Sequence, residues 1–162
     1  MPGETGGAHG DPPFQPSQLP ALLQVTSLGS GGGMASVGFY GAGKVALDSV
    51  SEAPAMEVEQ FGTKVTIVEM GGYATGLFTS GTTATPDPAY ASLRAKLAEM
   101  WGEDAGPDPA TAAPVIMEPA KLPEPPRRPI VGSRSFDIVQ KTDQERAELY
   151  RAGESLSRMA PG

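Results

Sequence analysis

The sequence predicts an α/β fold with a small parallel sheet of about three strands, flanking helices and a disordered N-terminus. Strand-like runs at residues 22–26, 64–69 and 129–132 alternate with helix-forming segments, and this alternation favours parallel strands joined by right-handed crossovers. The run at 64–69 is almost continuously β-branched, as expected of a strand covered on both faces. Residues 1–20 are dominated by Gly and Pro and bury too little apolar surface to fold.

The helix-forming segments follow in a regular order. A helix is predicted from about Gly38 to Gln60, where Pro54 costs about 3 kcal/mol or introduces a kink. A long loop from Met70 to about Asp87 comes next, and loops of this length are usually functional or mobile. Shorter helices are expected at 90–101 and 108–117. The last helix should end near Leu156. Its cap would be Ser133 or Ser135, and helical spacing predicts buried faces at Leu47, Val50 and Pro54 and at Phe136, Val139 and Leu149.

Composition excludes several classes of function. The chain has 162 residues, with 12 Lys and Arg against 19 Asp and Glu, a formal net charge of −7. Nucleic-acid binding depends on basic side chains that displace counterions, so we expect no nucleic-acid partner. There is no cysteine, and the single histidine, His9, lies in a Gly/Pro-rich stretch, so no metal site is expected. No apolar run is long enough to span a membrane. We therefore expect a cytoplasmic protein without a membrane partner.

Two residues in the first predicted helix suggest proton-transfer chemistry. Tyr40 and Lys44 are four residues apart and would share a helix face. An ammonium beside a phenol stabilises the phenolate, which a tyrosine needs in order to act as a general acid/base near neutral pH. Ser27, at the end of the preceding strand, could hydrogen-bond a substrate oxygen. A tyrosine–lysine pair at this spacing is often an ordinary surface pair, but this one follows a strand and a glycine-rich loop.

The region around these residues resembles the catalytic core of the short-chain dehydrogenase/reductase family. In that family a serine precedes, by thirteen residues, the tyrosine of a Tyr-x-x-x-Lys motif, and Ser27 and Tyr40 have this separation. Further along, Gly71 and Thr75 resemble the Pro-Gly-x-x-x-Thr loop of the family, with Met70 in place of the proline. The resemblance extends from about residue 24 to about residue 160.

The resemblance implies an oxidoreductase that uses NAD or NADP and a small-molecule alcohol or carbonyl substrate. Tyr40 would exchange the proton, Lys44 would assist it and hold the nicotinamide ribose, and Ser27 would orient the substrate oxygen. Tyr40, Lys44, Gly71 and Thr75 would also bind the cofactor, with Thr75 at the nicotinamide carboxamide. Hydride transfer itself belongs to the cofactor.

The same resemblance implies an incomplete Rossmann-like doubly wound sheet. Residues 1–21 would be a disordered Gly/Pro-rich segment, and 22–162 a truncated catalytic half with the last three of seven strands. Nothing in the sequence resembles the glycine-rich turn that places the pyrophosphate on a helix N-terminus. The residue that selects NAD or NADP and the catalytic asparagine of the family also have no counterpart. We therefore expect an incomplete cofactor site and little or no activity of this chain alone.

Two alternatives remain open at this stage. The chain could be a non-catalytic binding subunit that forms a homo- or hetero-oligomer through the helix that carries Tyr40. It could also be a degraded gene product, which Pro54, Met70 and Pro114 favour because they depart from the family pattern. Residues 1 to about 22 are interpreted as a misread or out-of-frame stretch or as a new start. The sequence specifies neither the substrate nor a preference between NAD and NADP.

Overall fold

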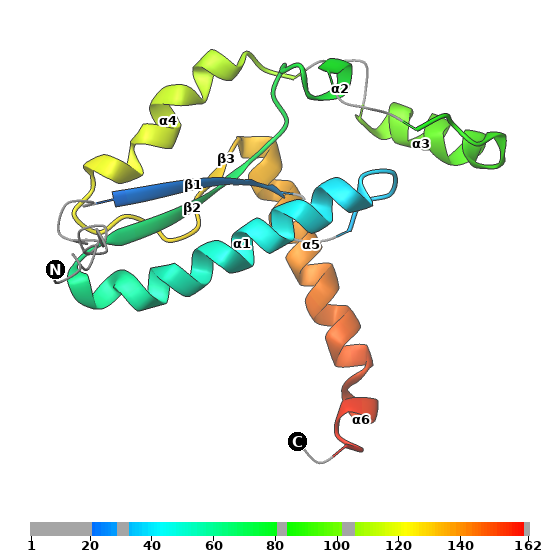
Figure 1. The fold of residues 1–162 in the computed structure, drawn as a ribbon. Helices are drawn as coiled ribbons and strands as arrows, with labels where there is room; N and C mark the ends of the chain where they lie inside the picture. Colours follow the sequence, from blue (N-terminus) through cyan, green and yellow to red (C-terminus); the bar gives the residue numbers. More distant parts are fainter. Residues whose placement is uncertain (1–20, 29–32, 81–83, 102–105, 161–162) are drawn as a thin grey trace, which may run out of the picture.

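The computed structural model describes residues 21–28, 33–80, 84–101 and 106–160, which form one parallel sheet with helices on both sides (Figure 1). The strand order is β1 (Ala21–Ser27), β2 (Lys64–Met70) and β3 (Ile130–Val131). β1 and β2 pair in parallel along their whole length, and β3 pairs in parallel with the end of β2. The predicted α/β fold is confirmed. The segment predicted to be disordered, 1–20, lies outside the described residues.

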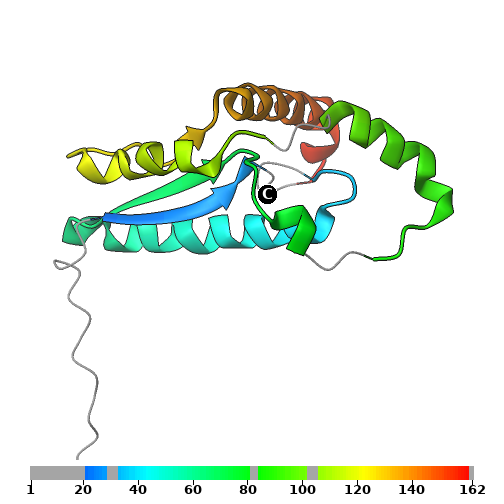
Figure 2. The same cartoon turned by 90° about the horizontal axis from the view of Figure 1, so that it is seen from above.

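Helices cover the two faces of the sheet unequally. The helices are α1 (Gly38–Val58), α2 (Leu77–Ser80), α3 (Ala91–Trp101), α4 (Ala113–Met117), α5 (Ser133–Ala152) and α6 (Glu154–Ser157). In the part of the chain that the structure describes, 3₁₀ turns accompany them at η3 (Glu59–Phe61), η4 (Pro88–Tyr90), η5 (Pro109–Thr111) and η6 (Pro119–Lys121). α1 lies along one face, α4 and the start of α5 lie on the other side, and α3 stands apart beyond the carboxyl ends of the strands (Figure 2).

β2 is the centre of the core. All five residues from Val65 to Glu69 are buried, because the strand has a neighbour on each edge and helices on each face. On the α4 side, Val68 packs with Ala112 and Val131 in a small apolar cluster. The near-continuous β-branched run therefore predicted this strand correctly.

The buried face of α1 differs from the predicted one. Val50 is 67% exposed, and the buried residues of the helix are Gly41, Asp48, Ser51 and Ala55. Small side chains let the helix lie close to the sheet, and Arg128 neutralises the buried charge of Asp48. Pro54 lies inside the helix without ending it.

The prediction for the last helix was wrong in two respects. Gly132, at φ +115°, is the N-cap of α5, and no side chain caps the helix, so Ser133 and Ser135 lie inside it. Val139 is buried as expected, but Phe136 and Leu149 are exposed. The later turns of α5, which carry Leu149, run away from the sheet (Figure 1). Within the described ranges, no helix combines the length and apolarity needed to cross a membrane.

Candidate active site

The carboxyl ends of β1 and β2 meet at one edge of the sheet, because the strands are parallel and in register. β1 ends at Ser27, which is half-buried and lies opposite Met70, the last residue of β2. α1 begins beside the same edge (Figure 1). In open α/β sheets, ligands usually bind at the carboxyl ends of the strands. The topology therefore brings the predicted site residues to the edge where a ligand is expected.

Tyr40 and Lys44 form the central pair of this candidate site. Tyr40 lies in the first turn of α1 and is exposed, and Lys44 follows one turn later on the same helix face. The Lys44 Nζ atom lies 6.0 Å from the centre of the Tyr40 ring, which is about the limit for a cation–π contact. The helix thus places an ammonium next to the phenol, as the four-residue spacing predicts.

A turn with an unusual backbone conformation leads into this helix. Ser36 has φ +70°, a left-handed conformation that is uncommon for residues other than glycine and that often occurs near functional sites. The Val37 amide donates to the Met34 carbonyl at 3.3 Å, and the Gly41 amide donates to the Val37 carbonyl at 2.8 Å. These bonds hold the turn that leads into α1 and the first turn of the helix, which carries Tyr40.

Gly71 and Thr75 lie in the loop that follows β2 at the same edge. A Cβ atom on Gly71 would lie 2.0 Å from the Ser135 Oγ atom and 3.2 Å from the Val131 carbonyl oxygen, so a larger residue here would force the Ser135 side chain of α5 to move. The Gly71 amide also donates to the Val131 carbonyl at 3.1 Å. Thr75 is exposed, and its amide donates to the Tyr73 carbonyl at 2.7 Å. The loop is therefore fixed at its start, with Thr75 accessible at the sheet edge.

Arg128 joins the helix that carries the pair to the central strand, and sequence reasoning did not identify it. Its guanidinium donates to Asp48 at 2.7 Å, to Glu52 at 2.5 Å and to Glu69 at 2.6 Å. Burial opposes its charge, but the hydrogen bonds to Glu69 and Asp48, with their negative charges, outweigh burial and raise the pKa of the guanidinium. A buried carboxylate needs a cation. Glu69, the acidic residue of the run 64–69, was therefore the signal in the sequence that a basic side chain should contact this strand.

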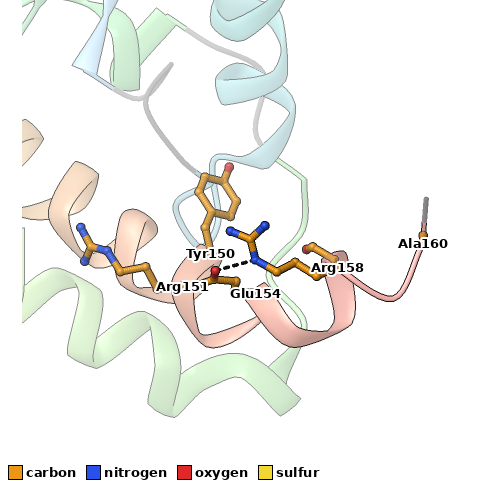
Figure 3. A pocket seen from close by; sticks show the side chains of 6 residues that line it. Tyr150, Arg151, Glu154, Arg158 and Ala160 are labelled. Carbon is orange, nitrogen blue, oxygen red and sulfur yellow. Dashed lines mark hydrogen bonds and ion pairs between the residues drawn. The ribbon is translucent and has the colours of Figure 1, made fainter. Parts of the chain in front are cut away.

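A hollow lies away from this edge, along the end of α5 and α6 (Figure 3). Its lining includes Tyr150, Arg151 and Arg158. The Arg158 Nε atom is already bonded to a Glu154 oxygen at 2.7 Å. The hollow is open to solvent and brings no acid/base pair together. No group of acidic or histidine side chains in the described ranges is arranged to hold a metal ion, and His9 lies outside those ranges.

Curated sequences similar to this chain are oxidoreductases. An uncharacterized oxidoreductase of Schizosaccharomyces pombe is 28% identical over 141 residues, which cover 84% of this chain and 48% of the relative. A 3-ketodihydrosphingosine reductase of Bacteroides thetaiotaomicron is 40% identical over 55 residues, 34% of this chain and 20% of the relative. The chain thus spans about half the length, or less, of these two relatives. No model of a known protein family matches it.

A solved structure shares the fold. The crystal structure of a short-chain dehydrogenase from Streptomyces avermitilis matches with a TM-score of 0.69 and 33% sequence identity. The match covers 88% of this chain and 52% of that chain. By its sequence relatives, which are oxidoreductases, and by its fold, which it shares with a solved short-chain dehydrogenase, the chain is similar to the short-chain dehydrogenase/reductase family, and it spans about half the length of the relatives it matches.

Proposed function

We propose that this chain supplies the tyrosine-dependent proton-transfer part of an NAD(P)-dependent oxidoreductase that interconverts an alcohol and a carbonyl compound. The observation that carries the proposal is the Tyr40–Lys44 pair at the start of α1, beside the carboxyl end of the strand that Ser27 terminates. The names of the curated relatives and of the solved dehydrogenase support the oxidoreductase class.

Each side chain has a distinct task in this proposal. In reduction, the Tyr40 hydroxyl gives its proton to the carbonyl oxygen, and in oxidation the phenolate takes the proton of the alcohol. The Lys44 ammonium stabilises the phenolate between these states. The Ser27 hydroxyl donates a hydrogen bond to the reacting oxygen and holds it near Tyr40. Bound NAD(P)H supplies the hydride in reduction.

The donor groups at this edge suit the nicotinamide end of the cofactor. Tyr40, Lys44 and Thr75 present hydroxyl and ammonium groups from α1 and from the loop after β2. Such groups can hydrogen-bond ribose hydroxyls and a carboxamide. The sequence offers no glycine-rich turn for the pyrophosphate. We therefore propose that the full reaction needs the rest of the family fold, either joined to this chain or on another polypeptide.

Cofactor binding to the purified chain tests this proposal. Calorimetric titrations with NADH, NADPH and reduced nicotinamide mononucleotide should give weak and similar affinities, because the three share the nicotinamide ribose. Tyr40→Phe and Lys44→Met should weaken all three. Lys64→Met, at the opposite end of β2, is the matched control and should leave binding unchanged. Binding that Lys44→Met does not weaken would contradict the proposed role of this pair.

A second candidate function is that of a binding subunit, with α1 as the interface. The outer side of α1 exposes large apolar side chains, including Phe39, Val50 and Met56. An exposed apolar surface on a helix often marks a protein contact. This observation favours a homo- or hetero-oligomer formed through the helix that carries Tyr40.

Sedimentation at several protein concentrations tests the second candidate. The chain should associate as concentration rises, and Val50→Lys should weaken association because it places a charge in the apolar surface. Ala42→Lys adds the same charge to the same helix at an exposed position without a large apolar side chain, and serves as the control. A chain that stays monomeric throughout, or that responds equally to both variants, would argue against this interface.

A further inference from the structure

α1 meets the sheet through a face with little apolar surface. Its buried residues are Gly41, Asp48, Ser51 and Ala55, and only the last has an apolar side chain. Leu47, Pro54 and Val58 beside them are half-buried. Hydrophobic burial scales with the apolar area removed from water and has no preferred direction. The most deeply buried part of this face therefore offers little apolar area, and apolar packing alone fixes the helix position weakly.

Arg128 provides a directional contact at the middle of that face. Its guanidinium reaches Asp48 and Glu52 on α1 and Glu69 on β2 at 2.7, 2.5 and 2.6 Å. Asp48 and Glu69 are almost fully buried. The planar guanidinium presents several donors in a fixed geometry, and hydrogen bonds between charged groups are among the strongest in proteins. One side chain thus bridges the helix and the strand.

The backbone on either side of Arg128 is itself fixed to β2. The Ile67 amide donates to the Arg127 carbonyl at 2.8 Å, and the Glu69 amide donates to the Pro129 carbonyl at 2.9 Å. Pro129 has a restricted backbone. The backbone of Arg128 is therefore fixed to the sheet, and its side chain reaches from there to α1.

The contacts of Arg128 lie close in sequence to the candidate site on both elements. Asp48 follows Lys44 by one helical turn, and Glu69 precedes Gly71 by two residues. We infer that Arg128 is a positioning residue that holds α1, the helix that carries Tyr40 and Lys44, at a fixed position relative to the carboxyl edge of the sheet. The inference rests on the proposed function, because the position of α1 against the sheet matters chemically only if Tyr40 and Lys44 take part in the reaction. A lysine at 128 would carry its three donors on one nitrogen atom and would lack the planar guanidinium that spreads its donors over carboxylates on two elements.

A distance measurement between two spin labels tests this inference in the chain itself. The chain has no cysteine, so Ala42→Cys on α1 and Asp137→Cys on α5 would be the only labelled positions, and both are exposed. Pulsed electron paramagnetic resonance should give a narrow distance distribution. Arg128→Met should broaden or shift it, and Arg128→Lys should restore it partly. Arg127→Met is the matched control, since among the described residues the Arg127 side chain pairs only with exposed Glu59, at 3.4 Å, and it should leave the distribution unchanged.

The outcomes separate positioning from a general effect on stability. A distribution that stays narrow in Arg128→Met, or that broadens equally in Arg127→Met, would overturn the inference even if the Arg128 variant melts earlier. If Arg128→Met does not fold, the triple variant with Asp48→Asn and Glu69→Gln removes the buried charges and should still broaden the distribution. A narrow distribution there would also overturn the inference. The cofactor titrations with Tyr40→Phe test the proposed function separately, because the label distance requires no cofactor.

Discussion

Replacing Arg128 by methionine should destabilise the fold more than any other single loss of an ion pair in the described ranges. The change leaves two carboxylates without their cation, and the side chains of Asp48 and Glu69 are only 10% and 7% exposed. The Asp48 Oδ1 atom already has no hydrogen-bond partner among the described residues. Removing one partner of a buried pair costs about 3–5 kcal/mol. Because the Arg128 side chain is 36% exposed, the lower end applies, about 3 kcal/mol.

Thermal and denaturant unfolding measure this loss. A change of about 3 kcal/mol should lower Tm by roughly 10 °C in a domain of this size. Arg127→Met should cost less than about 1 kcal/mol, because its ion pair is exposed. The triple variant that also carries Asp48→Asn and Glu69→Gln should recover most of the loss, since no buried charge remains.

An Arg128→Met protein within about 0.5 kcal/mol of the parent at neutral pH, on the scale of ordinary surface substitutions, would refute the buried-charge reasoning.

Three further predictions concern close packing and the sheet edge. Gly71→Ala should cost about 1–3 kcal/mol in urea unfolding, because its Cβ would collide with Ser135; an unchanged midpoint would refute the close approach. Gly132→Ala should cost about 1–3 kcal/mol, because φ +115° is strained for alanine, and its unfolding midpoint is the check. Val25→Lys should reduce aggregation, measured by light scattering. Val25 is exposed on β1, and within the described sheet β1 pairs with β2 alone, so its other edge is open to association. Equal scattering by the variant and the parent would argue against this edge as the aggregating surface.

The elements of the fold could be predicted from local pattern. The β-branched run at 64–69 and the helix that begins at Gly38 were identified because burial on two faces and helix-forming composition are local signals. The spacing of Tyr40 and Lys44 also follows from helix geometry alone, which is why the structure shows them on one face.

The contacts that hold those elements together could not be predicted in the same way. The apolar spacing in α1 suggested that Val50 faces the core, but Asp48 does, because Arg128 comes from 80 residues away to neutralise it. A helical-period argument counts apolar residues and takes no account of a distant cation. The N-cap of α5 is another such case. Gly132 occupies this position, where a serine was expected, because close packing of Ser135 against Gly71 and Gly132 fixes the start of the helix.

The most direct test of the proposed site asks which part of the cofactor touches this chain. Saturation-transfer NMR with NADH should show the strongest transfer to the nicotinamide and its ribose, and weak transfer to the adenine. Tyr40→Phe and Lys44→Met should reduce the nicotinamide signals, while Lys64→Met leaves them unchanged. Equal transfer to the adenine, or nicotinamide signals that neither variant at the pair reduces, would contradict the assignment of Tyr40 and Lys44 to the cofactor and the reacting proton.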